Sequence, residues 1–183
     1  MTQATILTRR RFIKETIRLS AGIIIASPFD GFAVTTKSKH LMTFYHTHTG
    51  ERLQIDYSCK ECSRATRKKL NSFLRDFRTG DVQPIDTELL DIIHGIQLNS
   101  GCKGTVEIIS GYRSPKTNKL LRSRSNGVAA KSLHMKGQAV DIRLSGLDTK
   151  KLRDIAISLQ KGGVGYYAKS DFVHIDTGRV RTW

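Results

Sequence analysis

The chain has 183 residues and a formal charge of +15, with 31 lysines and arginines against 16 acidic residues. This length is enough for one domain with a sizeable core, and the charge predicts a polyanionic partner, either a nucleic acid or an anionic polymer of the cell envelope. Aromatic residues make up only 7% of the chain. Because few of them interleave with the basic residues, no nucleic acid is expected as the partner.

The N-terminus has the pattern of an export signal. A twin arginine lies in the run Thr8–Lys14, and a diluted apolar stretch follows over residues 17–26. This is typical of a twin-arginine signal peptide, and the apolar stretch is too short for a bilayer span, which needs about 20 apolar residues. A small-x-Ala cleavage site then predicts that residues 1–33 are removed and that residues 34–183 form the mature domain.

Removal of this leader takes away five positive and two negative charges, so the mature chain keeps a formal charge of +12. We therefore expect a basic protein in the periplasm, with no stable membrane span in the mature chain and with an anionic polymer as partner. The sequence leaves the oligomeric state open.

Three cysteines are present, at Cys59, Cys62 and Cys102. The Cys-x-x-Cys pair fits a redox motif, half of a zinc site or a disulfide formed after export, and a four-cysteine zinc site is excluded by the count. The sequence does not decide among these roles.

The first expected element is a β-hairpin. Residues 41–45 and 52–57 alternate in polarity around a turn that contains Gly50. His46 and His48 would lie at the tip of the hairpin. Two histidines at this spacing share a strand face and could bind a metal, but a solvated turn is the better interpretation.

Four helices and a central strand follow. The helices are expected from a Ser63 N-cap to about residue 78, from an Asp86 N-cap onward, from Pro115 onward, and from an Asp148 or Thr149 N-cap onward. In the first, second and fourth of these helices apolar residues recur at helical spacing, so each of the three is expected to pack one side against a core. The run Val106–Ser110 has the composition of a central strand.

The stretch Ser132–Asp141 and the segment Asp171–Asp176 carry the strongest chemical signal. They supply His134 with Asp141 seven residues later, and then His174. Two imidazoles and a carboxylate form a protein ligand set for zinc that leaves a fourth position open. Short β runs around Asp141 and His174 would place these two residues side by side on neighbouring strands, while Gly137 supplies a bend that returns His134 over them.

Arg113 is the next candidate. It follows the central strand in the segment Ser110-Gly-Tyr-Arg-Ser114, and a guanidinium pairs two-pronged with a carboxylate or holds peptide carbonyls. The alternative is a structural arginine that fixes the loop. Local hydrogen bonding explains Tyr112 equally well. Residues 122–131 are polar and basic, and we expect them to border the cleft.

The pattern Ser-x-His-x-x-Gly-x-Ala-x-Asp over residues 132–141, with the later Asp-x-x-His over 171–174, resembles the M15-type zinc peptidases, which include D-Ala-D-Ala peptidases and periplasmic murein endopeptidases once grouped as a domain of unknown function. The similarity runs from about Leu41 to Trp183. It implies an α+β fold, with an antiparallel β-sheet and helices packed on it, as in hedgehog and D-Ala-D-Ala peptidase domains.

The resemblance also implies a function. It implies one Zn²⁺ per chain and hydrolysis of a peptide bond in peptidoglycan cross-links, with Arg113, Tyr112 and Ser132 on the substrate side. Asp171 stands where such enzymes keep the acid that serves as general base, and Asp176, which shares a strand face with His174, is the second candidate. The alternative is a non-catalytic, zinc-containing module that binds peptidoglycan. The sequence does not decide between 4-3 and 3-3 cross-links, or between endopeptidase and carboxypeptidase action.

Overall fold

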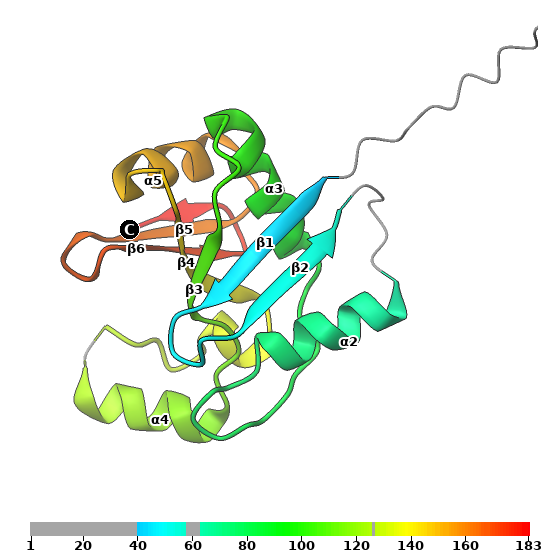
Figure 1. The fold of residues 1–183 in the computed structure, drawn as a ribbon. Coiled ribbons are helices and arrows are strands. Elements are labelled where there is room, and N and C mark those ends of the chain that lie inside the picture. The colour runs from blue at the N-terminus through cyan, green and yellow to red at the C-terminus, as the bar shows by residue number, and fades with distance from the viewer. Residues whose placement is uncertain (1–39, 58–62, 126) are drawn as a thin grey trace, which may run out of the picture. The chain divides into compact units, whose positions relative to one another are not determined.

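The structure is a computed structural model that describes residues 40–57, 63–125 and 127–183 (Figure 1). The expected leader at residues 1–33 and the pair Cys59 and Cys62 lie outside the described residues, so their roles stay predictions. Cys102 is half-buried with a free thiol, whose Sγ lies 3.3 Å from the Ser145 carbonyl oxygen. In the described part of the chain, no helix has the length and apolar character needed to cross a bilayer.

A seven-stranded sheet forms the centre of the described domain, in the spatial order β2-β1-β3-β4-β6-β5-β7. Its strands are β1 (Leu41–His46), β2 (Arg52–Asp56), β3 (Val106–Ser110), β4 (Ala139–Leu144), β5 (Gly163–Tyr167), β6 (Phe172–Asp176) and β7 (Arg181–Thr182). The expected wholly antiparallel sheet is wrong, because β1 pairs with β3 and β5 pairs with β7 in parallel. The long connection from β1 to β3, through β2 and two helices, allows the chain to return in the same direction. The fold class is α+β with a mixed sheet.

The helices are α2 (Arg64–Phe73), α3 (Glu88–Ser100), α4 (Pro115–Arg124) and α5 (Thr149–Ser158), with short 3-10 turns η1 (Leu133–Lys136) and η2 (Ala168–Ser170). The expected caps at Ser63 and Asp148 are confirmed, since both side chains accept hydrogen bonds from the first turn of their helices. Helix α2 ends at Phe73 instead of near residue 78. The reason is Asp76, whose carboxylate accepts from the Arg78 and Ser114 backbone N–H groups and so draws the chain into a turn.

Helices α3 and α5 contact each other, and α5 packs on β4, β5 and β6 (Figure 1). Side chains of alternate strand residues fill this interface: Val140, Ile142, Val173 and Ile175 are at most 1% exposed. By the period of two along a strand, Asp141 and His174 face the other side of the sheet. The pattern of the core therefore fixes which face of the sheet carries the polar residues.

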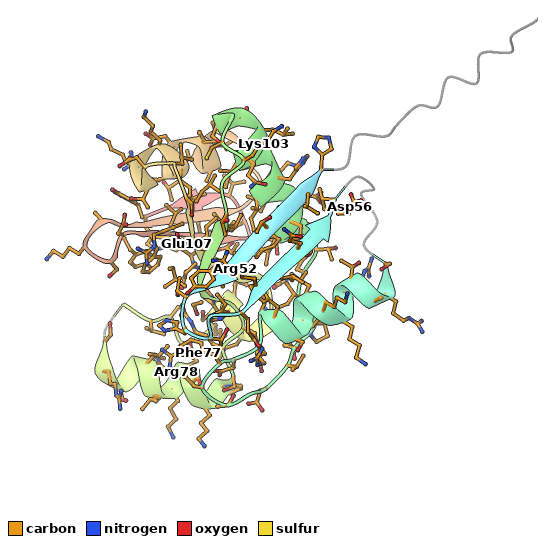
Figure 2. The ribbon with its side chains drawn as sticks, viewed as in Figure 1. Arg52, Asp56, Phe77, Arg78, Lys103 and Glu107 are labelled. Carbon is orange, nitrogen blue, oxygen red and sulfur yellow. The ribbon has the colours of Figure 1, made fainter. Side chains whose placement is uncertain are left out.

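The expected solvated turn at His46 and His48 holds only for His48. His46 ends β1 and is fully buried, with its ring edge-on to Phe73 and Phe77 at centroid distances of 5.9 and 5.6 Å. Its Nδ1 accepts from the His48 backbone N–H, and the His48 ring stacks on Phe77. The Arg78 guanidinium lies over the ring of Phe77 (Figure 2). His46 is therefore a core residue among aromatic rings.

Candidate metal centre

His134 is held in place by a tight turn. It lies in η1, and Gly137 ends this turn in the left-handed conformation with φ of 68°. A Cβ on Gly137 would lie 2.2 Å from the Pro84 carbonyl oxygen, so only glycine fits there. The expected bend at Gly137 is confirmed, and it brings the buried His134 ring back over β4.

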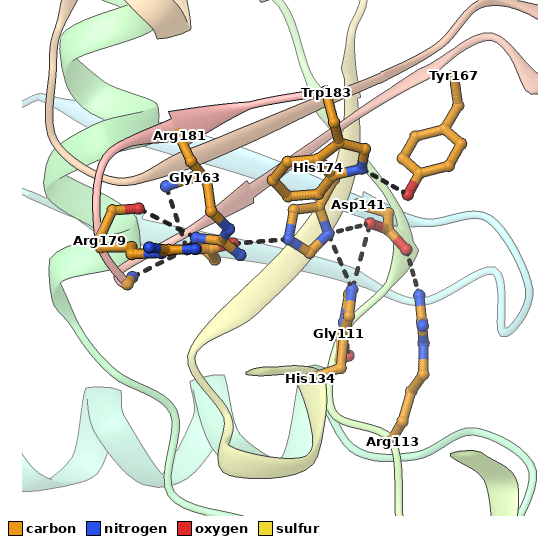
Figure 3. Close-up of polar contacts among 12 residues, drawn as sticks. Gly111, Arg113, His134, Asp141, Gly163, Tyr167, His174, Arg179, Arg181 and Trp183 are labelled. Atoms are coloured by element: carbon orange, nitrogen blue, oxygen red, sulfur yellow. Dashed lines mark hydrogen bonds and ion pairs between the residues drawn. The ribbon is translucent and has the colours of Figure 1, made fainter. Parts of the chain in front are cut away.

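Asp141 on β4 and His174 on β6 are directly opposite each other in an antiparallel pair, as the sequence predicts. His174 Nδ1 lies 2.9 Å from Asp141 Oδ1, and His134 Nε2 lies 3.2 Å from each of these two atoms (Figure 3). Zinc bonds of about 2.0–2.1 Å separate tetrahedral ligand atoms by about 3.3 Å. Among the described residues this is the group of side chains whose atoms could hold one metal ion.

The hydrogen bond of the outer nitrogen in each imidazole fixes the tautomer, and so decides whether the inner nitrogen presents a lone pair to the cluster. His134 Nδ1 lies 2.7 Å from the Gly111 carbonyl oxygen, which only accepts, so Nδ1 carries the proton and Nε2 presents its lone pair. His174 Nε2 lies 3.0 Å from Asp176 Oδ2 and donates to it, which leaves the His174 Nδ1 lone pair toward Asp141. Two lone pairs and a carboxylate oxygen therefore converge, as metal ligands do with outer partners that orient them.

Burial and charge set the protonation of the group. Burial lowers the pKa of His134 and keeps its imidazole neutral. Burial acts against the charge of Asp141, but the two histidines outweigh it and hold the pKa of this carboxyl well below its usual range. For His174, burial is outweighed by the neighbouring carboxylates of Asp141 and Asp176, which raise its pKa. The centre thus contains a carboxylate anion between two imidazoles.

Asp176 is fully buried and orients His174. Besides the imidazole, its carboxylate accepts from the Gly163 and Gly178 backbone N–H groups and from both terminal nitrogens of Arg181, at 3.0 and 2.7 Å. These hydrogen bonds outweigh desolvation and hold the pKa of Asp176 well below its usual range. Asp176 is therefore an anion whose two oxygens are both hydrogen-bonded, and it lies behind the candidate metal ligands. Its partner Arg181 was not predicted from the sequence.

Arg113 contacts the same cluster. Its Nη2 donates to Asp141 Oδ2 at 2.5 Å, its Nε donates to Ser110 Oγ at 3.0 Å, and its backbone N–H donates to the His134 carbonyl oxygen. The bulge in β3 between Ile108 and Ser110 shifts this end of the strand opposite Asp141. Arg113 thus joins the candidate ligand Asp141 to the loop after β3, a contact that the sequence did not predict.

A cavity of about 390 Å³ opens over the three candidate ligands. Arg113 and Ser132 line it, as do residues 127–129, Lys131, Tyr167, Phe172, Arg181 and Trp183. The basic loop after α4 therefore borders the cavity, as expected. Tyr112 is buried behind it, with its backbone N–H bonded to the Leu74 carbonyl oxygen, and does not line the cavity.

Asp171 lies apart from this cavity. It has a left-handed backbone conformation with φ of 50°, and its carboxylate accepts from Thr149 Oγ1 at 2.8 Å and pairs with Arg143 at 3.5 Å. Together with Glu107 these residues line a second, separate cavity. The structure therefore does not bring Asp171 to the three candidate ligands, and its role as general base stays a prediction.

Comparison with known proteins gives one consistent family. Residues 34–183 match the family model Peptidase_M15_2, described as peptidoglycan L,D-endopeptidase MepK. A probable peptidoglycan L,D-endopeptidase MepK of Haemophilus influenzae is 45% identical over 152 residues, which is 82% of each chain. The peptidoglycan L,D-endopeptidase MepK of Escherichia coli is 41% identical over 169 residues, which is 91% of each chain. The chain therefore belongs to the Peptidase_M15_2 family.

Proposed function

We propose that this protein is a zinc-dependent peptidoglycan endopeptidase of the periplasm. Its family is one of peptidases, and the observation that carries the proposal is the convergence of His134 Nε2, Asp141 Oδ1 and His174 Nδ1 beside an open cavity. A structural zinc site normally fills four protein positions. Three ligands that face a cavity instead leave a position for substrate, which supports catalysis.

The residues present fit one Zn²⁺ bound by His134, Asp141 and His174. When bound, zinc supplies a Lewis acid that polarises the scissile carbonyl. The Gly111 carbonyl and Asp176 hold the two imidazoles in the tautomers that metal binding needs. A D-Ala-D-Ala peptidase-like zinc fold is part of the same proposal and is supported by the family match.

The substrate side of the cavity is basic. Arg113, Lys131 and Arg181 line it, and Ser132 lies between this basic rim and His134. A guanidinium binds a carboxylate or carbonyl by charge-assisted hydrogen bonds. We therefore assign Arg113 two roles, since it holds Asp141 with one nitrogen and faces the cavity, where it can bind a substrate oxygen. Ser132 is assigned to substrate binding, and Tyr112 to support of the loop.

The proposed bond joins an L centre to a D centre. The names of the relatives state L,D-endopeptidase activity. In wall peptides a 4-3 cross-link joins two D centres, whereas a 3-3 cross-link runs from the L centre of one diaminopimelate to the D centre of the next. The 3-3 link is therefore the proposed substrate. Export by the twin-arginine leader, residues 1–33, would deliver the enzyme to this substrate.

Asp171 and Asp176 are the two candidates for the general base. Asp171 has the sequence position for it, but its carboxylate must leave Thr149 and Arg143 to reach the cavity. Asp176 is fully buried and already accepts from His174, Arg181 and two backbone N–H groups. Its arrangement supports orientation of His174 and opposes proton abstraction from a molecule in the cavity.

Digestion of purified sacculi by the mature protein tests the proposal. We expect soluble fragments whose masses show cleavage of 3-3 links, loss of this release with a chelator, and recovery with added zinc. The His134→Ala protein serves as control. Retention of the wild-type protein on sacculi with no new peptide ends under any of these conditions would show a non-catalytic binding module instead.

A further inference from the structure

Trp183, the C-terminal residue and the only tryptophan of the chain, forms one wall of the cavity. The tail reaches the site because β7 pairs with β5, and the pairing continues one residue further: the Trp183 N–H donates to the Val164 carbonyl oxygen, and Tyr166 N–H donates to the Trp183 carbonyl oxygen. Trp183 thus continues the regular pairing of the sheet and lies beside a candidate metal ligand.

Four contacts fix the indole ring. Its Nε1 donates to Tyr167 Oη at 3.0 Å, the Arg181 guanidinium lies 4.8 Å from its centroid, and the His174 ring lies 5.2 Å away (Figure 3). The ring also covers the Cα of Gly165, where a Cβ would approach it to 2.6 Å. A side chain held at this many points loses little further freedom when a ligand packs on it.

Despite these contacts, Trp183 is 50% exposed. A large aromatic surface that is fixed, half-exposed and directed into a cavity is a preformed contact surface for an apolar group. Tyr167 and Phe172, whose rings stack at 4.6 Å, continue the aromatic wall. Lys131 and Arg113 supply positive charge elsewhere in the same cavity, so an apolar group that ends in a carboxylate matches the cavity chemically.

We propose that Trp183 is a specificity-determining residue that packs on the methylene chain of the diaminopimelate residue at the scissile bond. This inference rests on the proposed function. Diaminopimelate has three methylene groups between two amino-acid centres, and in a 3-3 link each such residue presents this apolar tether with a free carboxylate at its D centre. Burial of about three methylene groups on one face is worth about 5- to 30-fold in binding.

A sugar ring of the glycan strand is the other group that could stack on an indole. The distance from Trp183 to His174 opposes it, because any group on this ring lies beside the candidate metal ligands and hence beside the scissile bond. The glycan is separated from that bond by the stem peptide, whose residues span about 3.3 Å each when extended. The structure therefore favours the diamino acid.

Steady-state cleavage of a soluble 3-3 cross-linked peptide dimer tests the proposal. We expect Trp183→Ala to raise KM about 5- to 30-fold, with kcat and zinc content unchanged, because the lost contact is the same in the ground and transition states. Val180→Ala is the matched control, since Val180 is equally exposed in the same tail but does not line the cavity. An unchanged KM in Trp183→Ala would overturn the proposal.

Two further measurements separate the alternatives. If Trp183→Ala affects only dimers that carry the disaccharide, and not the same dimers without sugars, the wall binds glycan and the proposal is wrong.

Fluorescence of the single tryptophan is a direct readout on the unmodified protein: a tripeptide that ends in diaminopimelate should shift its emission, and one that ends in alanine should not. A diaminopimelate tripeptide that competes with the dimer but leaves the emission unchanged would contradict contact with Trp183. Failure of the wild-type protein to cleave any dimer would instead reject the proposed function.

Discussion

Two groups of histidines lie at or beside the strands of this sheet, and their surroundings give them different chemistry. His46 is fully buried among Phe73 and Phe77, and its neighbour His48 is exposed and stacks on Phe77. His134 and His174 are buried against Asp141. Both groups contain a buried imidazole ring, but only in the second group does a carboxylate oxygen lie between two rings.

The difference lies in the partners of the ring nitrogens. His46 Nδ1 accepts from the His48 backbone N–H, and its Nε2 has no hydrogen-bond partner in the described part of the chain. His134 and His174 each bond one nitrogen to an outer oxygen and direct the other toward Asp141. Histidine spacing alone thus does not identify a metal site. The position of the acceptor behind each ring does, because it fixes the lone pair in front.

Loss of a candidate ligand is the change with the largest expected effect. His134→Ala removes one of three ligand atoms, so zinc should fall from one per chain to below detection, and cleavage of cross-linked dimers should be lost. Metal analysis of the dialysed protein and a dimer assay measure both. His48→Ala, on the other histidine group, should keep both values. Full zinc content in His134→Ala would show that the converging lone pairs are not the metal site.

The sequence predicted the parts of this comparison that depend on local pattern. The short runs of β-branched and aromatic residues around Asp141 and His174 predicted their strands, and Gly137 predicted the bend that returns His134. It could not predict the burial of His46, because that depends on Phe73 and Phe77, which arrive from α2 and the turn after it. The glycine-rich run that forms β5 was also missed as a strand, since glycine has low β propensity. Its pairing with β6 and β7 decides its structure.

The next largest effect concerns the acceptor behind His174. Asp176→Asn replaces one carboxylate oxygen by an amide NH₂ group. This NH₂ group then faces donors, either at Oδ2, which accepts from His174 and Arg181, or at Oδ1, which accepts from Arg181 and two backbone N–H groups. We expect zinc affinity to fall about 10- to 100-fold, in line with other partners of metal-bound histidines. Competition with a chromophoric chelator measures it, and Asp154→Asn on α5 is the control at an exposed ion pair. Unchanged zinc affinity would mean that Arg181 and the backbone N–H groups hold the side chain at position 176 in place without its negative charge.

The third prediction, Asp171→Asn, separates a carboxylate that acts as general base from one that is only structural. A general base predicts a loss of about 10²- to 10⁴-fold in turnover. A carboxylate that only joins Thr149 to Arg143 at an exposed position predicts a change within about three-fold, because the amide oxygen can still accept from Thr149. From these contacts we expect the smaller effect. A loss of 10²-fold or more at full zinc content would show that Asp171 moves into the cavity during turnover.

His46→Phe should leave turnover per folded molecule unchanged and should change only the response of stability to acid. Burial lowers the pKa of His46 below that of an exposed histidine, and the nearby His48 acts in the same direction. The unfolded chain therefore binds a proton at His46 more readily than the folded chain does. The stability that this neutral ring contributes is complete above about pH 6.5, the ordinary histidine value, and is lost as the pH falls from there toward the folded-state pKa.

The phenyl ring does not titrate, and the site around His46 is already made of phenyl rings. The free energy of unfolding of His46→Phe should hence decline less than that of the wild-type protein between pH 7.5 and pH 5.5. Urea titrations of both proteins at both pH values measure the difference. An equal decline in His46→Phe and wild type would mean that His46 takes up its proton as readily in the folded protein as in the unfolded chain. The aromatic environment would then not be what separates it from the histidines of the metal centre.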